Sequence, residues 1–272
     1  MPVTVPFEYL GHLVTVPARA GGLEATFIFD TGIGLTLISE SLAARAGCPR
    51  GSSTFTGRRM SGQAVTVPLG QLTSVSLGTC ELVSMPVGIF DMQAMAGLDG
   101  IDGFLSLSCF RTTPVTVDYR ARLMIIEDEA SLAGRAAAGI SVAVDVERDG
   151  CSTGVLLGID LPDGRPIRAE VDTGTDVLIL NQALAAQAGV DLNGDGVRTT
   201  EGRDETGREF TRYFTALAGN VRVTGAPLLT IANPQVMVQQ IIYDALVGDA
   251  FLRHFTTTYD LANGRMIFTA PR

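Results

Sequence analysis

The tripeptide Asp-Thr-Gly occurs twice in this chain, at residues 30–32 and 172–174, and the copies are 142 residues apart in a sequence of 272. Each copy directly follows a strand-like run, which predicts that both aspartates stand on turns at strand ends. Two equivalent turns from two similar halves can meet at a pseudo-twofold axis. The feature therefore favours a fold in which two carboxyl groups come together.

The similarity between the halves extends beyond the tripeptide when the second half is shifted by 142 residues without a gap. Residues 37–47 then fall on residues 179–189, and both segments contain Leu-Ala-Ala, any residue, then Ala-Gly. A residue suited to capping a helix precedes each segment's apolar face, and a glycine suited to the left-handed conformation ends it. We infer an internal duplication in which each half builds one lobe.

The turn dipeptides and short alternating runs predict a mainly β protein with short helices. Each half is long enough to form its own hydrophobic core. We expect an N-terminal lobe at residues 1–128, a connection at residues 129–138 that is rich in Ala, Gly and charge, and a C-terminal lobe at residues 139–272.

Composition excludes several classes of partner. The net charge of −9 leaves no basic stripe to neutralise phosphates, so we expect no nucleic acid. No apolar run approaches the ~20 residues that span a bilayer. The four cysteines show neither metal-ligand spacing nor a disulfide framework, and we expect no metal and no cofactor. No signal peptide follows Met1, which predicts the cytoplasm if Met1 is native, and the periplasm or secretion if an export signal was trimmed.

Two carboxyl groups within hydrogen-bonding range can hydrolyse an amide where one alone is feeble. Their repulsion splits the titration, so that the pair holds one proton over a wide pH range. The ionised member can take a proton from a water, while the protonated member polarises the carbonyl and then protonates the leaving amine. Asp30 and Asp172 are therefore the candidates for the catalytic pair.

The residues after each aspartate suit the same arrangement. Gly32 and Gly174 allow a tight turn and a close approach of the two loops. The hydroxyls of Thr31 and Thr173 can donate hydrogen bonds across the axis to the opposite loop. We expect these four residues to support the active site.

On these motifs the chain resembles the aspartic proteases of the retropepsin/pepsin clan. The resemblance rests on both Asp-Thr-Gly turns with their preceding Phe29 and Val171, and on the later run at residues 246–248, Leu-Val-Gly. In that family a hydrophobic-hydrophobic-Gly segment braces the Asp turn. The resemblance implies a bilobal acid-protease fold, with two similar β-barrel-like lobes around a pseudo-twofold axis, here as two fused retropepsin-like halves of a single chain. It also implies that Asp30 and Asp172 are catalytic.

The resemblance implies further roles around the pair. Thr175 would support Asp172 through its hydroxyl, and Asp176 would contact the backbone of the substrate. Two polar hairpin tips would act as flaps that are mobile without substrate and close over it, and their substrate-binding residues would be Ser61, Gly62, Thr206 and Gly207.

Two departures from the family pattern leave two readings of the function. Ile33 stands where the family carries Ser, Thr or Ala, and Ser106 stands in place of the first bracing glycine. The leading reading is an aspartic-type endopeptidase that binds an extended peptide or protein segment between its lobes. It would act as a monomer, because one chain holds both aspartates. The alternative is a catalytically weak or inactive peptide-binding or regulatory protein with the same fold.

Overall fold

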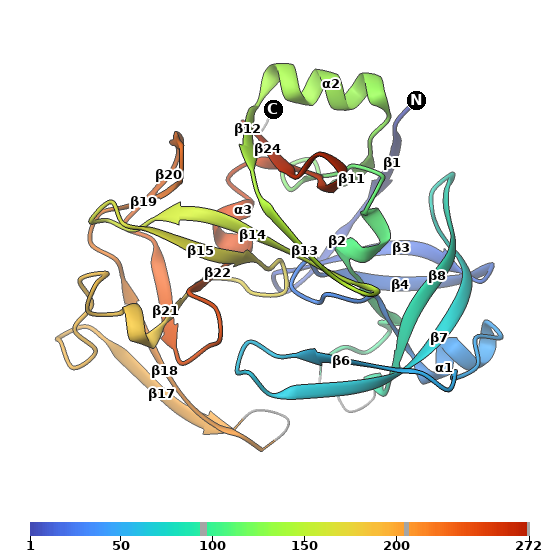
Figure 1. Cartoon of the computed structure of the whole chain (residues 1–272), viewed down its shortest axis with the longest axis horizontal. Helices are drawn as coiled ribbons and strands as arrows, with labels where there is room; N and C mark the ends of the chain where they lie inside the picture. Colours follow the sequence, from blue (N-terminus) through green and yellow to red (C-terminus); the bar gives the residue numbers. More distant parts are fainter. Residues whose placement is uncertain (93–96, 204–206, 271–272) are drawn as a thin grey trace.

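The structure is a computed structural model that describes residues 1–92, 97–203 and 207–270. It is mainly β and has two lobes (Figure 1). The eight-stranded sheet of the first lobe has the order β2 (Glu8–Leu10), β3 (Leu13–Ala20), β4 (Leu23–Phe29), β9 (Gly103–Leu105), β5 (Leu37–Ser39), β8 (Cys80–Phe90), β7 (Ala64–Leu77) and β6 (Thr54–Arg58).

The second lobe is built on a sheet of similar plan. Its order is β17 (Arg198–Arg203), β18 (Glu209–Ala216), β21 (Gln235–Gln239), β16 (Leu178–Asn181), β22 (Ala245–Val247), β15 (Pro166–Val171), β14 (Ser152–Asp160), β19 (Asn220–Val223) and β20 (Ala226–Ala232), with β13 (Asp145–Asp149) paired to β14. In both lobes a strand leading to an Asp-Thr-Gly turn pairs in parallel with a short later strand, β4 with β9 and β15 with β22.

A third sheet joins the two lobes. Its order is β1 (Val3–Pro6), β11 (Leu123–Ile126), β10 (Val115–Asp118), β23 (Thr256–Asp260), β24 (Arg265–Thr269) and β12 (Ile140–Ala143). At its centre Thr116 of the first lobe pairs with Thr258 of the second, and their hydroxyls are 2.7 Å apart. These two positions exchange under the 142-residue shift, so the pseudo-twofold axis passes between them.

The short helices follow the repeated plan in part. They are α1 (Glu40–Arg45), η2 (Leu107–Phe110), α2 (Glu129–Ala138), η3 (Gln182–Leu184), α3 (Asp249–Leu252) and η4 (Leu261–Asn263), where η marks a 3₁₀-helix. Ser39 caps α1 and Asn181 caps η3 through their side chains. The second segment is 3₁₀ rather than α, and it begins with neutral Gln182 where α1 has Glu40, a charge that favours a helix N-terminus. None of the helices in the described residues is long and apolar enough to cross a membrane.

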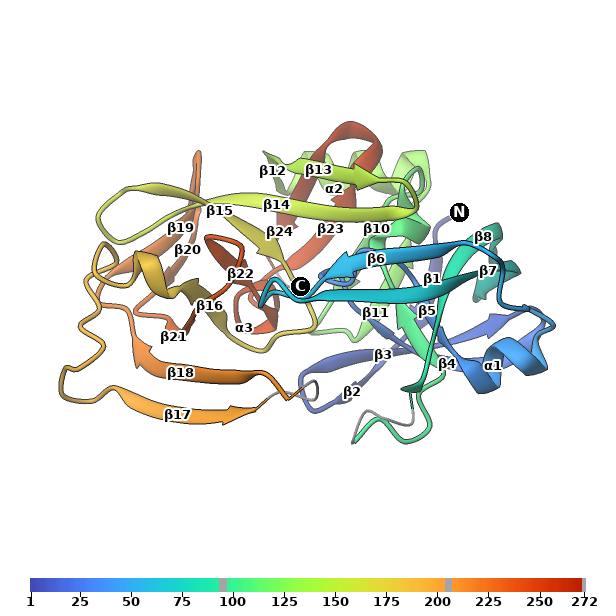
Figure 2. The same cartoon turned by 60° about the horizontal axis from the view of Figure 1, so that its bottom comes forward.

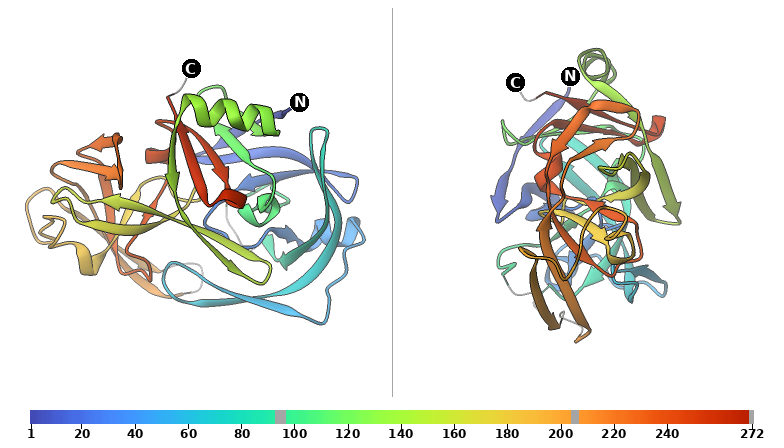
Figure 3. Two further views of the ribbon diagram at one scale, coloured as in Figure 1. Left: turned by 45° about the horizontal axis from the view of Figure 1, so that its top comes forward. Right: turned by 90° about the vertical axis from the view of Figure 1, so that its left-hand side faces the viewer.

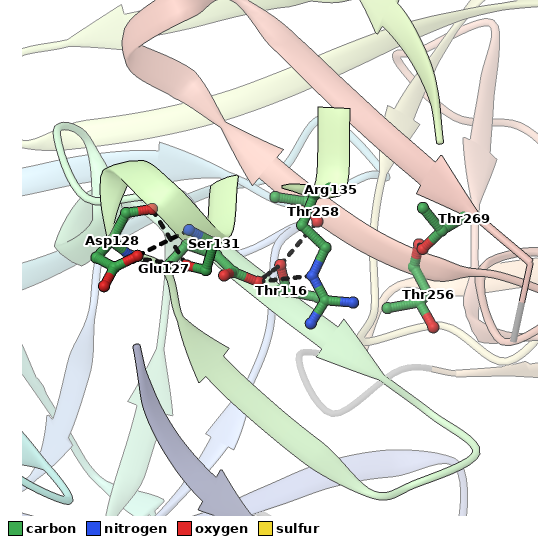
Figure 4. A network of polar contacts seen from close by, with 8 residues as sticks. All are labelled: Thr116, Glu127, Asp128, Ser131, Arg135, Thr256, Thr258 and Thr269. Carbon is green, nitrogen blue, oxygen red and sulfur yellow. Dashed lines mark hydrogen bonds and ion pairs between the residues drawn. The ribbon is translucent and has the colours of Figure 1, made fainter. Parts of the chain in front are cut away.

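The connection between the lobes forms helix α2, which lies next to β12 and β24 (Figures 1 and 3). It begins with a capping box, in which Asp128 accepts a hydrogen bond from the Ser131 amide and Ser131 accepts one from the Asp128 amide. Beneath it Glu127 is buried, and its Oε1 accepts hydrogen bonds from Thr116 Oγ1 at 2.6 Å and from Arg135 Nε at 2.9 Å (Figure 4). A partly buried ion pair therefore ties α2 to the centre of the shared sheet.

We expect Arg135→Met to destabilise the protein by about 3–5 kcal/mol, because it leaves the carboxylate of Glu127 buried without its cation. The measurement is urea-induced unfolding. Arg165→Met is the matched control, since its ion pair with Asp163 is exposed at 3.8 Å and exposed pairs contribute about 1 kcal/mol or less. Equal stabilities for the two variants would show that the partly buried pair does not hold α2 in place.

Candidate active site

Both Asp-Thr-Gly turns leave buried strands and are anchored in the same way. The last side chains of β4 and β15, Phe29 and Val171, are fully buried in the core. The backbone amide of Asp30 donates to Leu105 O and that of Asp172 donates to Val247 O, each at 3.0 Å. The parallel pairing of each lobe thus fixes where its aspartate emerges.

The threonines lock the two turns to each other. The amide of Thr31 donates to Thr173 Oγ1 and the amide of Thr173 donates to Thr31 Oγ1, both at 3.0 Å. Each hydroxyl then donates to a carbonyl of the opposite lobe, Thr31 to Val171 at 2.6 Å and Thr173 to Phe29 at 2.9 Å. Both threonines are buried, so four reciprocal bonds hold the relative position of the turns.

The carboxyl groups of Asp30 and Asp172 meet at the axis and share a hydrogen bond. The glycines make room for this contact. A Cβ on Gly174 would lie 2.7 Å from Asp30 Oδ2 and 3.0 Å from Asp172 Oδ1, and a Cβ on Gly32 would overlap the Asp172 carboxyl. Any larger residue at either position would push the carboxyl groups apart.

Burial is the main cause that raises the pKa of Asp30 and of Asp172. The charge of Asp172 raises the pKa of Asp30 further, while the amides of Gly32 (2.9 Å) and Ile33 (3.2 Å) donate to Asp30 Oδ1 and lower it. The amide of Gly174 lowers the pKa of Asp172, and so does the shared hydrogen bond, which raises the pKa of Asp30. Both shifts favour a pair that keeps a proton above the ordinary pKa of an aspartate.

Thr175 differs from our expectation. In the described part of the chain the partners of the Asp172 carboxyl are the Gly174 amide and Asp30, and the Thr175 hydroxyl is not among them. The side chain of Thr175 instead packs beside Gly248, where a Cβ would lie 2.8 Å from its methyl carbon. Thr175 supports the turn through its backbone, since its amide donates to Asp172 O at 3.3 Å and its carbonyl accepts from the Asp249 amide at 2.8 Å.

The bracing segments explain why one lobe has glycine and the other serine. A Cβ on Gly248 would lie 2.7 Å from Val177 O, so the second lobe requires glycine. In the first lobe Ser106 is fully buried, and its hydroxyl contacts Thr36 Oγ1 at 3.2 Å and Gly34 O at 3.4 Å. Ser106 therefore braces the first turn by hydrogen bonding rather than leaving it loose.

The first hairpin tip, between β6 and β7, reaches the second lobe (Figure 2). Met60 O accepts a hydrogen bond from the Ile242 amide at 2.9 Å, and Ser61 O accepts one from Arg208 Nη1 at 2.7 Å. Met60, Ser61 and Gly62 are partly buried, although the polar sequence of this tip favours exposure. The reason is that this tip packs on the opposite lobe and contacts Arg208, on the connection between the two strands of the second hairpin.

The structure says less about the other residues that we expect to bind substrate. Asp176 is exposed, and its carbonyl accepts a hydrogen bond from the Ala250 amide at 2.9 Å. Gly207 lies before β18 with a φ of +80°, which favours glycine. Thr206 lies outside the described residues.

Sequence reasoning missed a third acid next to the pair. Glu170 lies on β15 two residues before Asp172 and is only 8% exposed. Burial first, and then the charge of Asp172, raises its pKa to about 8, against the hydroxyl of Tyr243, which lowers it. The signal was available in the 142-residue register, because the equivalent position in the first half is Ile28.

We expect the free energy of unfolding to fall as the pH rises from 4.5, the ordinary pKa of glutamate, to about 8, its value for Glu170 in the fold. In this range the folded state holds a proton that the unfolded chain has released. Glu170→Gln should remove part of this slope and stabilise the protein by a few kcal/mol at pH 8, at about 1.4 kcal/mol per pKa unit. Urea unfolding across this range measures the slope. The exposed acid Glu81 on β8, changed to Gln, should leave it unaltered, and identical slopes in both variants would contradict the assignment.

Two comparisons with known proteins, one of sequence and one of structure, agree on the fold of this chain. Residues 16–108, a segment that contains the first Asp-Thr-Gly turn, match the aspartyl protease family model. No protein of curated function matches the sequence significantly. Among solved structures, basic 7S globulin from soybean is similar with a TM-score of 0.61 and 12% sequence identity, over 98% of this chain and 96% of that chain. At that identity the likeness concerns the fold alone, which is the bilobal pepsin-like fold.

Proposed function

We propose that this chain, a retropepsin- and pepsin-like protein, is an aspartic endopeptidase that uses Asp30 and Asp172 as its catalytic pair. One observation carries the proposal: two half-buried carboxyl groups share a hydrogen bond on turns that are bonded reciprocally through Thr31 and Thr173. Such a pair provides a protonated carboxyl, which can act as an acid, beside a carboxylate, which can act as a base. We also attribute the 142-residue register to internal duplication.

We place the shared proton on Asp30, and this assignment decides the roles of the two acids. The ionised Asp172 takes a proton from a water bound between the carboxyl groups, and the water oxygen attacks the carbonyl carbon of the peptide. Asp30 gives its proton to the carbonyl oxygen, which yields a tetrahedral diol. The proton gained by Asp172 then passes to the amine nitrogen as the C–N bond breaks, and a diol proton returns to Asp30. Each assisted transfer contributes about 10²–10⁴-fold.

The hairpins would control access to this pair. An extended peptide would bind between the lobes by β-type hydrogen bonding. The bonds of Met60 with Ile242 and of Ser61 with Arg208 would open to admit it and close again over it. Asp176, Ser61, Gly62, Thr206 and Gly207 remain our proposed substrate contacts. Since both aspartates lie on one chain, the active species would be a monomer of 28.6 kDa.

The test is a digest of a proteome-derived peptide library from acidic to alkaline pH, with the wild type beside Asp30→Asn. We expect internal cleavage by the wild type and none by the variant. If the wild type binds library peptides without cutting them at any pH, the alternative of an inactive peptide-binding protein replaces the endopeptidase. Equal cleavage by both proteins would contradict the role of Asp30.

A further inference from the structure

Each lobe carries a cluster of apolar side chains on the sheet face next to its Asp turn. In the first lobe Ile28 and Phe104 belong to this cluster, with Ile33 of the Asp turn packed against them. In the second lobe Ile179 and Leu246 belong to the corresponding cluster. Leu246 is the 142-residue equivalent of Phe104, so the two clusters occupy equivalent places on either side of the pair.

The clusters differ in one respect that bears on what they can bind. Glu170 pairs with Leu246 across β15 and β22 in the register in which Ile28 pairs with Phe104 across β4 and β9. Paired residues of neighbouring strands lie on the same face, so Glu170 belongs to the second-lobe cluster as Ile28 belongs to the first. An acid thus stands where the symmetric position is apolar. The second cluster also holds Tyr243, whose hydroxyl faces the carboxyl of Glu170 as a donor.

In the part of the chain that the structure describes, the strongest charges on Glu170 come from acids and not from a cation. The charges that act on it most strongly are those of Asp172, Asp30 and Glu147, all of them acids. Arg168, on the same strand, is engaged by Asp145 at 2.8 Å and Glu147 at 4.0 Å. Across the sheet, Gly154 has no side chain, and a Cβ there would lie 4.0 Å from Glu170 Oε1. A buried acid beside other acids favours a positive ligand group.

We propose that Glu170 makes the second-lobe cluster a subsite for a basic side chain, Lys or Arg, beside the scissile bond, while the first-lobe cluster takes a large apolar side chain. This inference rests on the proposed function, because it places the two clusters next to the bond that the pair would cut. The methylene stem of the ligand would pack on Leu246 and Ile179, and its charged end would bind Glu170. An apolar side chain at the same place would therefore bind more weakly. Met60 of the first hairpin packs on this cluster and would cover the bound side chain.

The test uses hydroxyethylene peptide analogues that cannot be hydrolysed and that differ only in Lys or norleucine at either residue flanking the mimicked bond. Calorimetry with the wild type should show a Lys preference of about tenfold or more at one of the two positions. Glu170→Ile introduces the residue type found at the equivalent first-lobe position, Ile28, and it should reverse that preference toward norleucine. Glu170→Gln, which keeps the shape of the side chain, should abolish it even if the Ile variant folds poorly. Glu147→Gln, a matched loss of a nearby exposed acid, should retain it.

Several results would overturn the subsite: equal binding of Lys and norleucine by the wild type, an unchanged Lys preference in Glu170→Gln, or no binding of any analogue. Binding of these analogues does not require turnover, so the binding result tests the subsite separately from the proposed endopeptidase activity. A Lys preference without hydrolysis of any peptide would contradict the endopeptidase and leave the subsite standing. Hydrolysis that ignores Lys in the wild type would contradict the subsite alone.

Discussion

Asp30→Asn is expected to abolish peptide hydrolysis and to raise the stability of the fold at neutral pH. Activity should fall by at least about 10³-fold, because the variant keeps the shape of the side chain but removes the group that gives and recovers the proton. Stability should rise because burial and the charge of Asp172 oppose ionisation of Asp30, and the neutral amide removes this conflict. The measurements are kcat/KM on a peptide found in the library digest and the thermal midpoint of each protein.

The double variant of Asp30 and Asp172, both changed to Asn, should be no less active than either single variant. Residues that act as a unit lose their effect together, so the losses are not additive. Asp163→Asn is the control, since Asp163 is exposed and precedes β15, at the opposite end of that strand from the Asp172 turn. Near-wild-type hydrolysis by either single variant would contradict the two-acid mechanism, whatever its stability.

Thr31→Val is expected to lower the free energy of unfolding by about 2–5 kcal/mol and to reduce activity as well. The change keeps the volume but leaves Val171 O and the Thr173 amide without their partner, and each unpaired buried group costs about 1–3 kcal/mol. Urea unfolding measures the loss. Thr31→Ser should restore much of it, because a hydroxyl is present again.

The matched control for that change is Thr56→Val in the first hairpin. Thr56 is exposed and its hydroxyl contacts Thr66 Oγ1 at 2.7 Å, so its loss should cost less than about 1 kcal/mol. Equal losses in Thr31→Val and Thr56→Val would mean that the reciprocal bonds do not hold the two turns together.

The sequence predicts the parts of the fold that depend on local pattern and on the repeat. Gly47 and Gly189, expected to end the two helical segments, have φ values of +62° and +76°. The pairing of Thr116 with Thr258 was not predicted, because apolar alternation marks a strand without naming its partner. Helix α2 likewise depends on a burial of Glu127 beneath it that no local pattern shows.

In the candidate site, too, the sequence predicts the features that depend on local motifs and not those that depend on tertiary packing. The Asp-Thr-Gly motifs place the carboxyl groups. The orientation of the Thr175 side chain instead depends on its packing beside Gly248, which is distant in sequence. Glu170 was missed because residues 167–170 alternate apolar and charged, a pattern that predicts an exposed acid. Near the Asp turn the outer face of the sheet is covered, partly by Met60 of the opposite lobe. Alternation identifies the face of a strand but not what packs upon it.

The most direct test of the account is an NMR titration of the protein with ¹³C-labelled aspartate carboxyl groups, assigned through Asp30→Asn and Asp172→Asn. We predict that the pair loses its two protons in separate steps, that Asp172 ionises first, and that Asp30 keeps its proton well above the ordinary aspartate pKa of about 3.9. In Asp172→Asn the pKa of Asp30 should fall, because the neighbouring charge is gone. Two independent titrations near the ordinary value, unchanged by the loss of either partner, would contradict a shared proton and the mechanism built on it.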